Sequence, residues 1–260
     1  MPAANPHKIK RYGWIPDLPD ARDHLYAAPA PVMKVLPSKV DLRPNCPPVY
    51  DQGDLGSCTA NAIGAAIQFD RTKQGLKPDF VPSRLFIYYN ERAMEGTVSA
   101  DSGAQIRDGI KSVAKQGACP EPDWPYVIAK FATKPPKQDY QEALADRAVS
   151  YSRLVQNLNL LKGCLASGYP FVFGFTVYES FESQTVAQTG MVPMPSPKEQ
   201  VLGGHAVMAA GYDDGTGRFI VRNSWGTDWG VGGYFMMPYA YVTDSSLSDD
   251  LWTIRLISQK

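Results

Sequence analysis

The hydrophobic pattern of the chain changes its period near the middle. From residue 57 to 117, apolar residues recur at helical spacing, and Gly75, Gly96 and Gly117 follow the periodic stretches as helix stops. Beyond residue 148, short runs rich in β-branched and aromatic residues are separated by glycine turns, as in antiparallel strands. This order predicts an α+β fold in which a helical lobe precedes a lobe built on an antiparallel β-sheet or barrel. A cleft between two lobes is a natural place for a site.

The composition of the chain limits its partners. With 260 residues, 44% of them hydrophobic, the chain can form one large domain or two lobes with a buried core. Lys plus Arg and Asp plus Glu both number 26, so the net charge is zero, and we expect no nucleic acid or anionic membrane as a partner. No apolar stretch approaches the roughly 20 residues that span a bilayer. A monomer with a small polar or peptide-like partner is expected.

The first 36 residues are rich in proline and lack periodicity, which predicts an extended arm. Apolar residues, among them Trp14 and Leu18, are spaced along this arm like anchors. We therefore expect the arm to dock on the rest of the chain. The first residues contain no apolar core of the length that a Sec signal peptide needs, so the expected location is cytoplasmic, or export uses another route.

The chemistry of the chain centres on one cysteine. Cys58 falls in the first turn of a predicted helix that begins after Ser57, a residue suited to cap it. A helix N-terminus stabilises a thiolate through its N–H groups and dipole, which makes the thiol a better nucleophile. Gln52, six residues upstream, carries an amide donor that could meet an oxyanion.

A thiol nucleophile also needs a base, and His205 is the only histidine in the strand-rich half. Taken alone, His205 would more often be a core histidine on a strand. Asn223 in the stretch RNSWGTDWG could orient the far ring nitrogen of His205, and Trp225 could cover that contact. Nucleophile, base and orienting residue are the minimum set for acyl transfer by a thiol.

Metal chemistry is not expected. The four cysteines form no C-x-x-C pair, and only three histidines could join them, so we predict no metal site and no cofactor. Whether Cys46 and Cys119 form a disulfide is left open by their spacing.

Three stretches, QGDLGSC, GGHAVMAAGYDD and RNSWGTDWGVGGYF, resemble the papain family of cysteine peptidases, in a bacterial branch. The similarity covers roughly residues 36 to 257. It implies a two-lobe fold with the active-site cleft between the lobes. It also implies an endopeptidase that hydrolyses peptide or protein substrates through a Cys58 thiolate/His205 imidazolium pair and an acyl-enzyme intermediate. The implied organisation is an arm over 1–36 and a peptidase domain over 37–257, with a mainly helical lobe over 37–135 and a mainly β lobe over 136–257.

The resemblance also implies roles for single residues. Cys58 corresponds to the nucleophile, His205 to the base and then acid, Asn223 to the orienting residue, and the Gln52 side chain with the Cys58 amide to the oxyanion hole. Trp225 would shield the contact between Asn223 and His205.

Substrate-binding residues follow from the same resemblance. Gly103 falls where family members bind the substrate backbone through a glycine pair. Gly204 and Ala206, which flank His205, would border the second subsite. Because both are small and uncharged, an apolar preference is expected there.

The chain departs from the family pattern in two places. Thr59 and Leu55 replace the usual aromatic residue and cysteine beside the nucleophile, so one family disulfide is missing. The arm is short and proline-rich, whereas most family zymogens carry a longer helical prodomain. We hypothesise that the arm occludes the groove and regulates the enzyme, with Trp14 or Leu18 in an apolar subsite.

Two other functions use the same residues. A thiol acyltransferase or isopeptidase would need the same nucleophile, base and oxyanion hole. A non-catalytic binding protein would keep the arm permanently in the groove.

Overall fold

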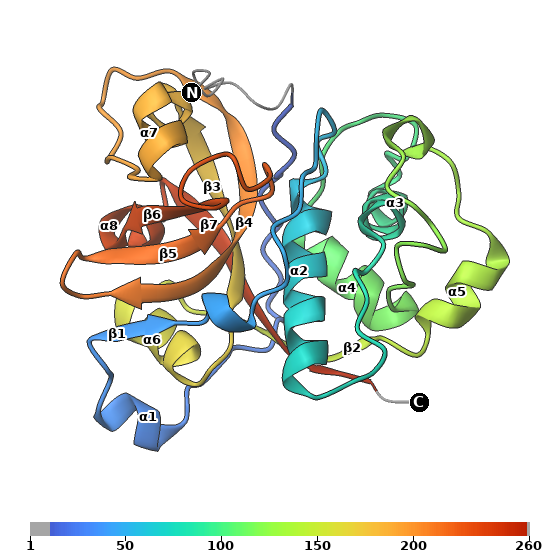
Figure 1. The fold of residues 1–260 in the computed structure, drawn as a ribbon, viewed down its shortest axis with the longest axis horizontal. Coiled ribbons are helices and arrows are strands. Elements are labelled where there is room, and N and C mark those ends of the chain that lie inside the picture. The colour runs from blue at the N-terminus through green and yellow to red at the C-terminus, as the bar shows by residue number, and fades with distance from the viewer. Residues whose placement is uncertain (1–10, 259–260) are drawn as a thin grey trace.

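A computed structural model describes residues 11–258 (Figure 1). Residues 1–10 of the arm lie outside the described residues. The helices are α1 (Ala30–Lys34), α2 (Cys58–Lys73), α3 (Arg84–Glu95), α4 (Ile106–Gln116), α5 (Lys137–Ala143), α6 (Leu158–Ala166), α7 (Gln184–Thr189) and α8 (Tyr239–Thr243). The strands are β1 (Lys39–Asp41), β2 (Ala148–Arg153), β3 (Phe171–Tyr178), β4 (Val201–Asp213), β5 (Arg218–Arg222), β6 (Tyr234–Pro238) and β7 (Ser248–Ile257).

The strands form one antiparallel sheet in the order β2-β7-β3-β4-β5-β6, and β1 pairs with β4. The predicted α+β class is confirmed, and the sheet is open and not a closed barrel. β1 adds to the sheet although it lies early in the chain, so the residues that lead into α2 start from the β side of the molecule.

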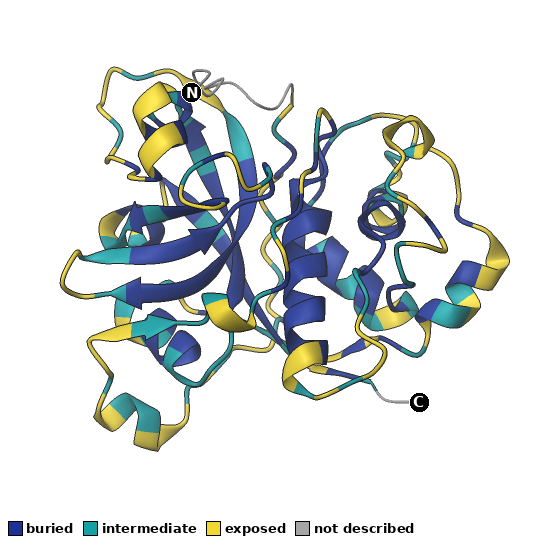
Figure 2. Cartoon of the chain, viewed as in Figure 1, coloured by how far each residue is buried: buried dark blue, intermediate teal, exposed yellow. Residues whose placement is uncertain are grey.

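Helix α2 stands between the other large helices and the sheet (Figure 1). It packs against α3 and α4 on one side and against β4 and β7 on the other. Every residue from Cys58 to Arg71 is buried, as the dark blue of this helix shows (Figure 2). The small side chains of its alanine-rich sequence allow neighbours to approach closely on all sides. The first residue of α2 is thereby fixed at the boundary between helices and sheet.

The helix ends follow the sequence pattern. Gly96 after α3 takes a left-handed conformation, and its N–H donates to the carbonyl of Arg92. Gly117 closes α4 in a similar way through the carbonyl of Val113. Ser83 caps α3, because its hydroxyl accepts from the N–H of Phe86. Within residues 11–258, no helix combines the length and apolar character needed to cross a membrane. All four cysteines are free thiols.

The sheet separates two hydrophobic cores. Alternate residues of a strand point to opposite faces, and along β3 this sends Val172 to the core shared with α2. Phe171, Phe173 and Phe175 belong to the second core, on the other face, together with Trp225. Because both faces are covered, β3 is buried almost throughout and carries no polar alternation.

The described part of the arm is docked along the molecule. Near its start, Trp14 bridges to Ala104, just before α4, and its N–H donates to the carbonyl of Gly204 on β4 (2.9 Å). Further on, the N–H of Tyr26 donates to the carbonyl of Arg153 on β2 (2.8 Å). The arm therefore makes backbone contacts with both the helical side and the sheet.

Candidate active site

Cys58 is the first residue of α2 and is fully buried. The loop before it is tied to the loop after β5, because the N–H of Gln52 donates to the carbonyl of Ser224 (2.9 Å) and Asp51 bridges to Trp225. The prediction that the Ser57 side chain caps this helix is wrong. Its hydroxyl makes no capping bond and lies instead 2.5 Å from the Tyr126 hydroxyl. The N–H groups at the start of α2 are thus not satisfied by a side-chain cap at Ser57.

His205 lies on β4, and Asn223 follows the end of β5. The Nε2 atom of His205 is 2.8 Å from the Oδ1 atom of Asn223. This oxygen also accepts from the N–H of Ser224 (2.9 Å), which fixes the orientation of the amide. Because an amide oxygen only accepts, Nε2 carries the imidazole proton. The Nδ1 atom of His205 is buried and makes no hydrogen bond with any residue in 11–258, so its lone pair is available to take a proton.

The early helix and the late strand meet at the sulfur of Cys58. Burial raises the pKa of this thiol, and the backbone of Ala206, the residue after His205, and the backbone of Gly13 in the arm oppose that increase by hydrogen bonding. The structure therefore brings Cys58 beside the segment that carries His205. These residues are separated by most of the chain and are joined by the packing of α2 on β4.

Trp225 covers the imidazole. Its ring centroid lies 5.0 Å from that of His205 with the planes 30° apart, and Trp225 is fully buried. Phe181 and Trp229 pack against the other sides of this indole at 5.6 and 4.9 Å. This aromatic cluster keeps water from the hydrogen bond between His205 and Asn223.

Gln52 is fully buried and held at both ends of its amide. Its Nε2 atom donates to the carbonyl of Leu55 (2.8 Å), and its Oε1 atom accepts from the hydroxyl of Ser224 (2.7 Å). An amide nitrogen carries two hydrogens, so one donor remains after the bond to Leu55. Ser224 was not identified from the sequence, where only its place beside Asn223 could have drawn attention.

Burial determines the charge state of the two central groups. It raises the pKa of the Cys58 thiol to about 12, against the opposing hydrogen bonds from Ala206 and Gly13. Burial also lowers the pKa of His205 to about 4, although the bond to Asn223 acts in the other direction. With the arm docked, both groups are therefore neutral at pH 7.

The groove beside these residues holds the arm as an extended peptide. The N–H of Ala104 donates to the carbonyl of Gly13 (2.8 Å), and the N–H of Ile15 donates to the carbonyl of Ala104 (3.0 Å). A Cβ atom on Gly103 would lie 2.2 Å from the carbonyl oxygen of Gly13. Gly103 therefore lies where a side chain would block the groove.

Trp14 fills a pocket in the wall of the groove. A Cβ atom on Gly174 would lie 1.9 Å from its ring, and one on Gly204 would lie 2.6 Å from its carbonyl oxygen. Ala206 belongs to the same buried cluster as Trp14 and Cys58. The indole Nε1 donates to the Oδ2 atom of Asp250 (3.0 Å). Asp250 was missed at the sequence level, although two acids at the start of an apolar strand were a signal.

Leu18 does not fill a subsite, so this alternative for the apolar anchor is wrong. Its side chain is 71% exposed. The arm is fixed here by other groups: the N–H of Leu18 donates to Oε1 of Gln105 (3.1 Å), and the buried carboxylate of Asp17 accepts from Nε1 of Trp252 (3.0 Å). These contacts turn the Leu18 side chain outward.

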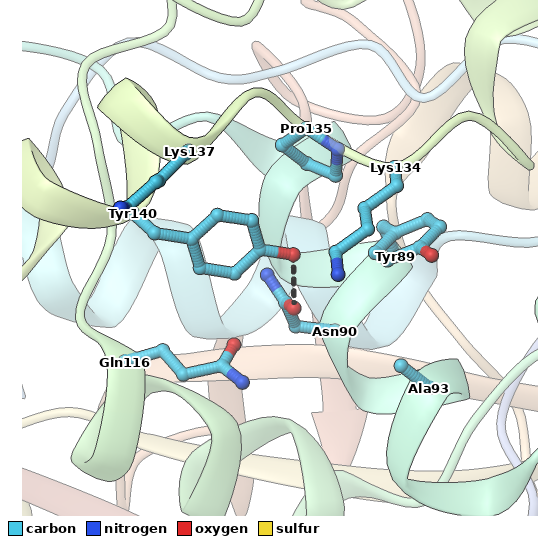
Figure 3. Close-up of a pocket in the computed structure, with 8 residues that line it drawn as sticks. All are labelled: Tyr89, Asn90, Ala93, Gln116, Lys134, Pro135, Lys137 and Tyr140. Atoms are coloured by element: carbon cyan, nitrogen blue, oxygen red, sulfur yellow. Dashed lines mark hydrogen bonds between the residues drawn. The ribbon is translucent and has the colours of Figure 1, made fainter.

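A cavity among the helices lies apart from this groove. Among the residues described, no group of three or more His, Cys, Asp or Glu side chains is arranged to hold a metal ion. A cavity of about 600 Å³ lies in the helical lobe, where the Tyr140 hydroxyl donates to Oδ1 of Asn90 (2.8 Å; Figure 3). Its lining includes Lys134 and Gln116 and none of the groove residues.

Comparison with known proteins gives consistent results. The model of the family described as "Papain family cysteine protease" matches residues 36–250. The uncharacterised peptidase C1-like protein L477 of Acanthamoeba polyphaga mimivirus is 44% identical over 96% of this chain and 88% of its own length.

Solved structures are similar as well. The structure of xylellain, a cysteine protease from Xylella fastidiosa, superposes with a TM-score of 0.90 at 46% identity over 98% of both chains. A procathepsin B from Trypanosoma congolense shares the fold, with a TM-score of 0.77 at 19% identity over 96% of this chain and 87% of the other.

The buried, neutral thiol predicts slow chemical modification. With a pKa of about 12, Cys58 has far less thiolate at pH 7 than an ordinary cysteine, so iodoacetamide should alkylate it at least about a hundredfold more slowly than a free cysteine peptide. Peptide-resolved mass spectrometry of the full chain measures this rate. The urea-unfolded chain is the control and should react at the ordinary rate; fast alkylation of the folded chain at Cys58 would contradict the assignment.

Proposed function

Because the chain belongs to the papain family of cysteine proteases, we propose that it is an endopeptidase in which Cys58 attacks the substrate and His205 transfers the proton. The observation that carries this proposal is the groove itself. It holds an extended peptide by backbone bonds to Ala104 and Gly204, directly beside a thiol at a helix N-terminus and an oriented imidazole.

The reaction divides into two acyl transfers. The Cys58 proton moves to Nδ1 of His205, and the sulfur attacks the carbonyl carbon of the substrate. The carbonyl oxygen of the substrate, which gains negative charge, accepts hydrogen bonds from the free N–H of the Gln52 amide and from the backbone N–H of Cys58. Collapse of this intermediate breaks the C–N bond, and the leaving amine takes the proton from Nδ1. Water then loses a proton to Nδ1 and attacks the thioester, which releases the acid and returns the proton to sulfur.

Asn223 and Trp225 support this cycle without touching the substrate. The Asn223 carbonyl oxygen accepts from Nε2, which keeps Nδ1 free in each neutral step and stabilises the imidazolium when it forms. Trp225 excludes water from this bond and so keeps it strong. The dipole of α2 favours the thiolate once the groove opens to solvent or substrate.

Hydrolysis of fluorogenic peptide amides tests the proposed activity. Cys58→Ala should abolish it, and Gln52→Ala should lower kcat about a hundredfold or more, because one donor to the oxyanion is lost. Gln138→Ala, on the exposed face of α5, is the matched control and should leave both kcat and KM unchanged. If Cys58→Ala hydrolyses the peptides at the same measurable rate as the unsubstituted or the Trp14→Ala chain, Cys58 is not the nucleophile. Product formed only with an added amine acceptor would indicate acyl transfer in place of hydrolysis.

We further propose that the arm keeps this enzyme latent. Trp14 occupies a groove pocket, Gly13 lies against the sulfur, and the ring of Tyr12 lies 6.2 Å from that of His205. A substrate must displace these residues before it reaches Cys58. The docked arm also holds both reacting groups in their neutral forms.

Replacing the buried anchor should therefore activate the full chain. Trp14→Ala removes an indole that is 9% exposed, a loss of about 3 to 5 kcal/mol for a buried tryptophan, and should raise both peptide hydrolysis and Cys58 alkylation at least about tenfold. Leu18→Ala, four residues along the same arm, removes an exposed side chain and should change neither. If both variants behave like the wild type, the arm does not control access to Cys58.

Docking of the arm should be stronger at acidic pH. Burial raises the pKa of Asp250 and of Glu182, which accepts from the Tyr12 hydroxyl, to about 7, and it raises the pKa of Asp17 against the opposing charges of Arg107 and Arg153. Release exposes these acids and returns their pKa toward about 4. The docked state then binds more protons, so its extra stability is complete below about pH 4 and is lost as pH rises to about 7.

The ratio of Cys58 alkylation rates between Trp14→Ala and wild type reports this dependence. The ratio should increase as pH falls from about 7.5 to about 5, because the intrinsic titration of Cys58 and His205 affects both chains alike. Glu182→Gln, which cannot titrate, should make the dependence shallower. A ratio that is constant or that decreases toward acid would show that these carboxyl groups do not control docking.

A further inference from the structure

The pocket that holds Trp14 has an acidic residue at its end. Asp250 lies in β7, is fully buried, and adopts a φ of 56°, in the left-handed region that aspartate and asparagine tolerate better than most residues. Its Oδ2 atom accepts two hydrogen bonds from the arm: one from Nε1 of Trp14 (3.0 Å) and one from the N–H of Asp17 (2.7 Å). Its Oδ1 atom accepts from Nη2 of Arg153 on β2 (3.1 Å).

Release of the arm affects the two oxygens differently. Oδ1 keeps its donor, because Arg153 belongs to the sheet. Oδ2 loses both donors at once. When a bound substrate excludes water from the pocket, a carboxylate oxygen without a donor is unfavourable, so a side chain that supplies an N–H or O–H is favoured over one of equal shape that does not.

The walls of the pocket favour a flat side chain. The indole lies where Cβ atoms on Gly174 and Gly204 would collide with it, at 1.9 and 2.8 Å. The pocket has room for the indole because the residues on both walls are glycines, which have no Cβ atom. The apolar preference expected from Gly204 and Ala206 agrees with these walls, but it does not account for the carboxylate at the end of the pocket.

The surrounding charges do not favour a cation in particular. Asp249 and Asp250 stand against Arg153, which bonds both. Arg107 on α4 is also close enough for its pKa to be raised by the charge of Asp250. Two acids and two guanidinium groups leave no net negative charge after the arm departs. What the empty pocket lacks is a hydrogen-bond donor for Oδ2 of Asp250, and not a positive charge.

We infer that Asp250 determines specificity, and that the Trp14 pocket selects a substrate with an aromatic side chain that carries a hydrogen-bond donor, such as tryptophan or tyrosine. This inference rests on the proposed function. The resemblance of Gly204 and Ala206 to the borders of the second subsite assigns this side chain to the residue two before the scissile bond.

Isosteric substrates test the inference on the full chain. Trp14→Gly empties the pocket and weakens the docking of the arm, while the rest of the arm sequence is unchanged. Dipeptidyl coumarin amides that differ only in the residue two before the scissile bond then compare tryptophan with benzothienylalanine, which has the same shape without the N–H, and tyrosine with phenylalanine. We expect kcat/KM to be about tenfold or more higher for each donor-bearing member, as for a hydrogen bond to a charged group.

Asp250→Asn in the same chain is the matched variant. Asparagine fits the left-handed backbone, and its oxygen should stay with Arg153, which turns its NH₂ group toward the pocket. The donor preference should then disappear or reverse, while phenylalanine and benzothienylalanine peptides keep their rates within about threefold. The comparison within Trp14→Gly alone needs no change at Asp250, so poor folding of the variant does not remove the test.

The outcomes separate this inference from the proposed function. Hydrolysis of all four peptides with ratios near one in the Trp14→Gly chain would overturn the role of Asp250 and leave the peptidase assignment intact. A donor preference that persists unchanged in a folded Asp250→Asn chain would also overturn it. If no peptide is hydrolysed and none slows alkylation of Cys58, the proposed function itself fails.

Discussion

The burial of α2 between the helices and the sheet is the constraint on which the site depends. A helix that is enclosed on all sides cannot shift relative to β4 without opening the core that it shares with the sheet. Its first residue, Cys58, is therefore held at a fixed place beside Ala206. The same packing aims the N-terminus of α2 into the groove, where its N–H groups are available to a thiolate and to an oxyanion. The geometry of the candidate site is therefore a consequence of core packing and not of local loop structure.

Much of this arrangement could be predicted from the sequence because it is encoded locally. Helical spacing identified α2, α3 and α4, and glycine at 96 and 117 identified where two of them end. The apolar run PFVFGFTVY identified β3 as a buried strand. Cys58, His205 and Asn223 stand in motifs that resemble a known family, so their identity did not require coordinates.

The parts that could not be predicted depend on contacts between distant segments. Asp250 lies more than 230 positions from Trp14, and nothing near either residue indicates their hydrogen bond. Leu18 was a reasonable anchor by hydrophobicity, but the bonds of Asp17 and of the Leu18 backbone decide which way the arm turns. Ser57 has the right residue type for a cap, yet Tyr126 from a later loop takes its hydroxyl. In each case a tertiary partner overrides a local preference.

Under the proposed function, the orientation of the arm explains how a peptide can lie against Cys58 without being hydrolysed. The Gly13 backbone acts to lower the pKa of the Cys58 thiol, as an N–H that faces the sulfur does, and an N–H lies in the plane of its peptide group. A nucleophile must instead approach a carbonyl carbon from above that plane. The carbonyl of Gly13 is meanwhile bonded to the N–H of Ala104 on the opposite wall. The arm thus offers the sulfur an N–H in place of a carbonyl face. Hydrolysis of the arm at this point would require the peptide to rotate and to give up the bonds at Ala104 and Gly204 that hold it in the groove.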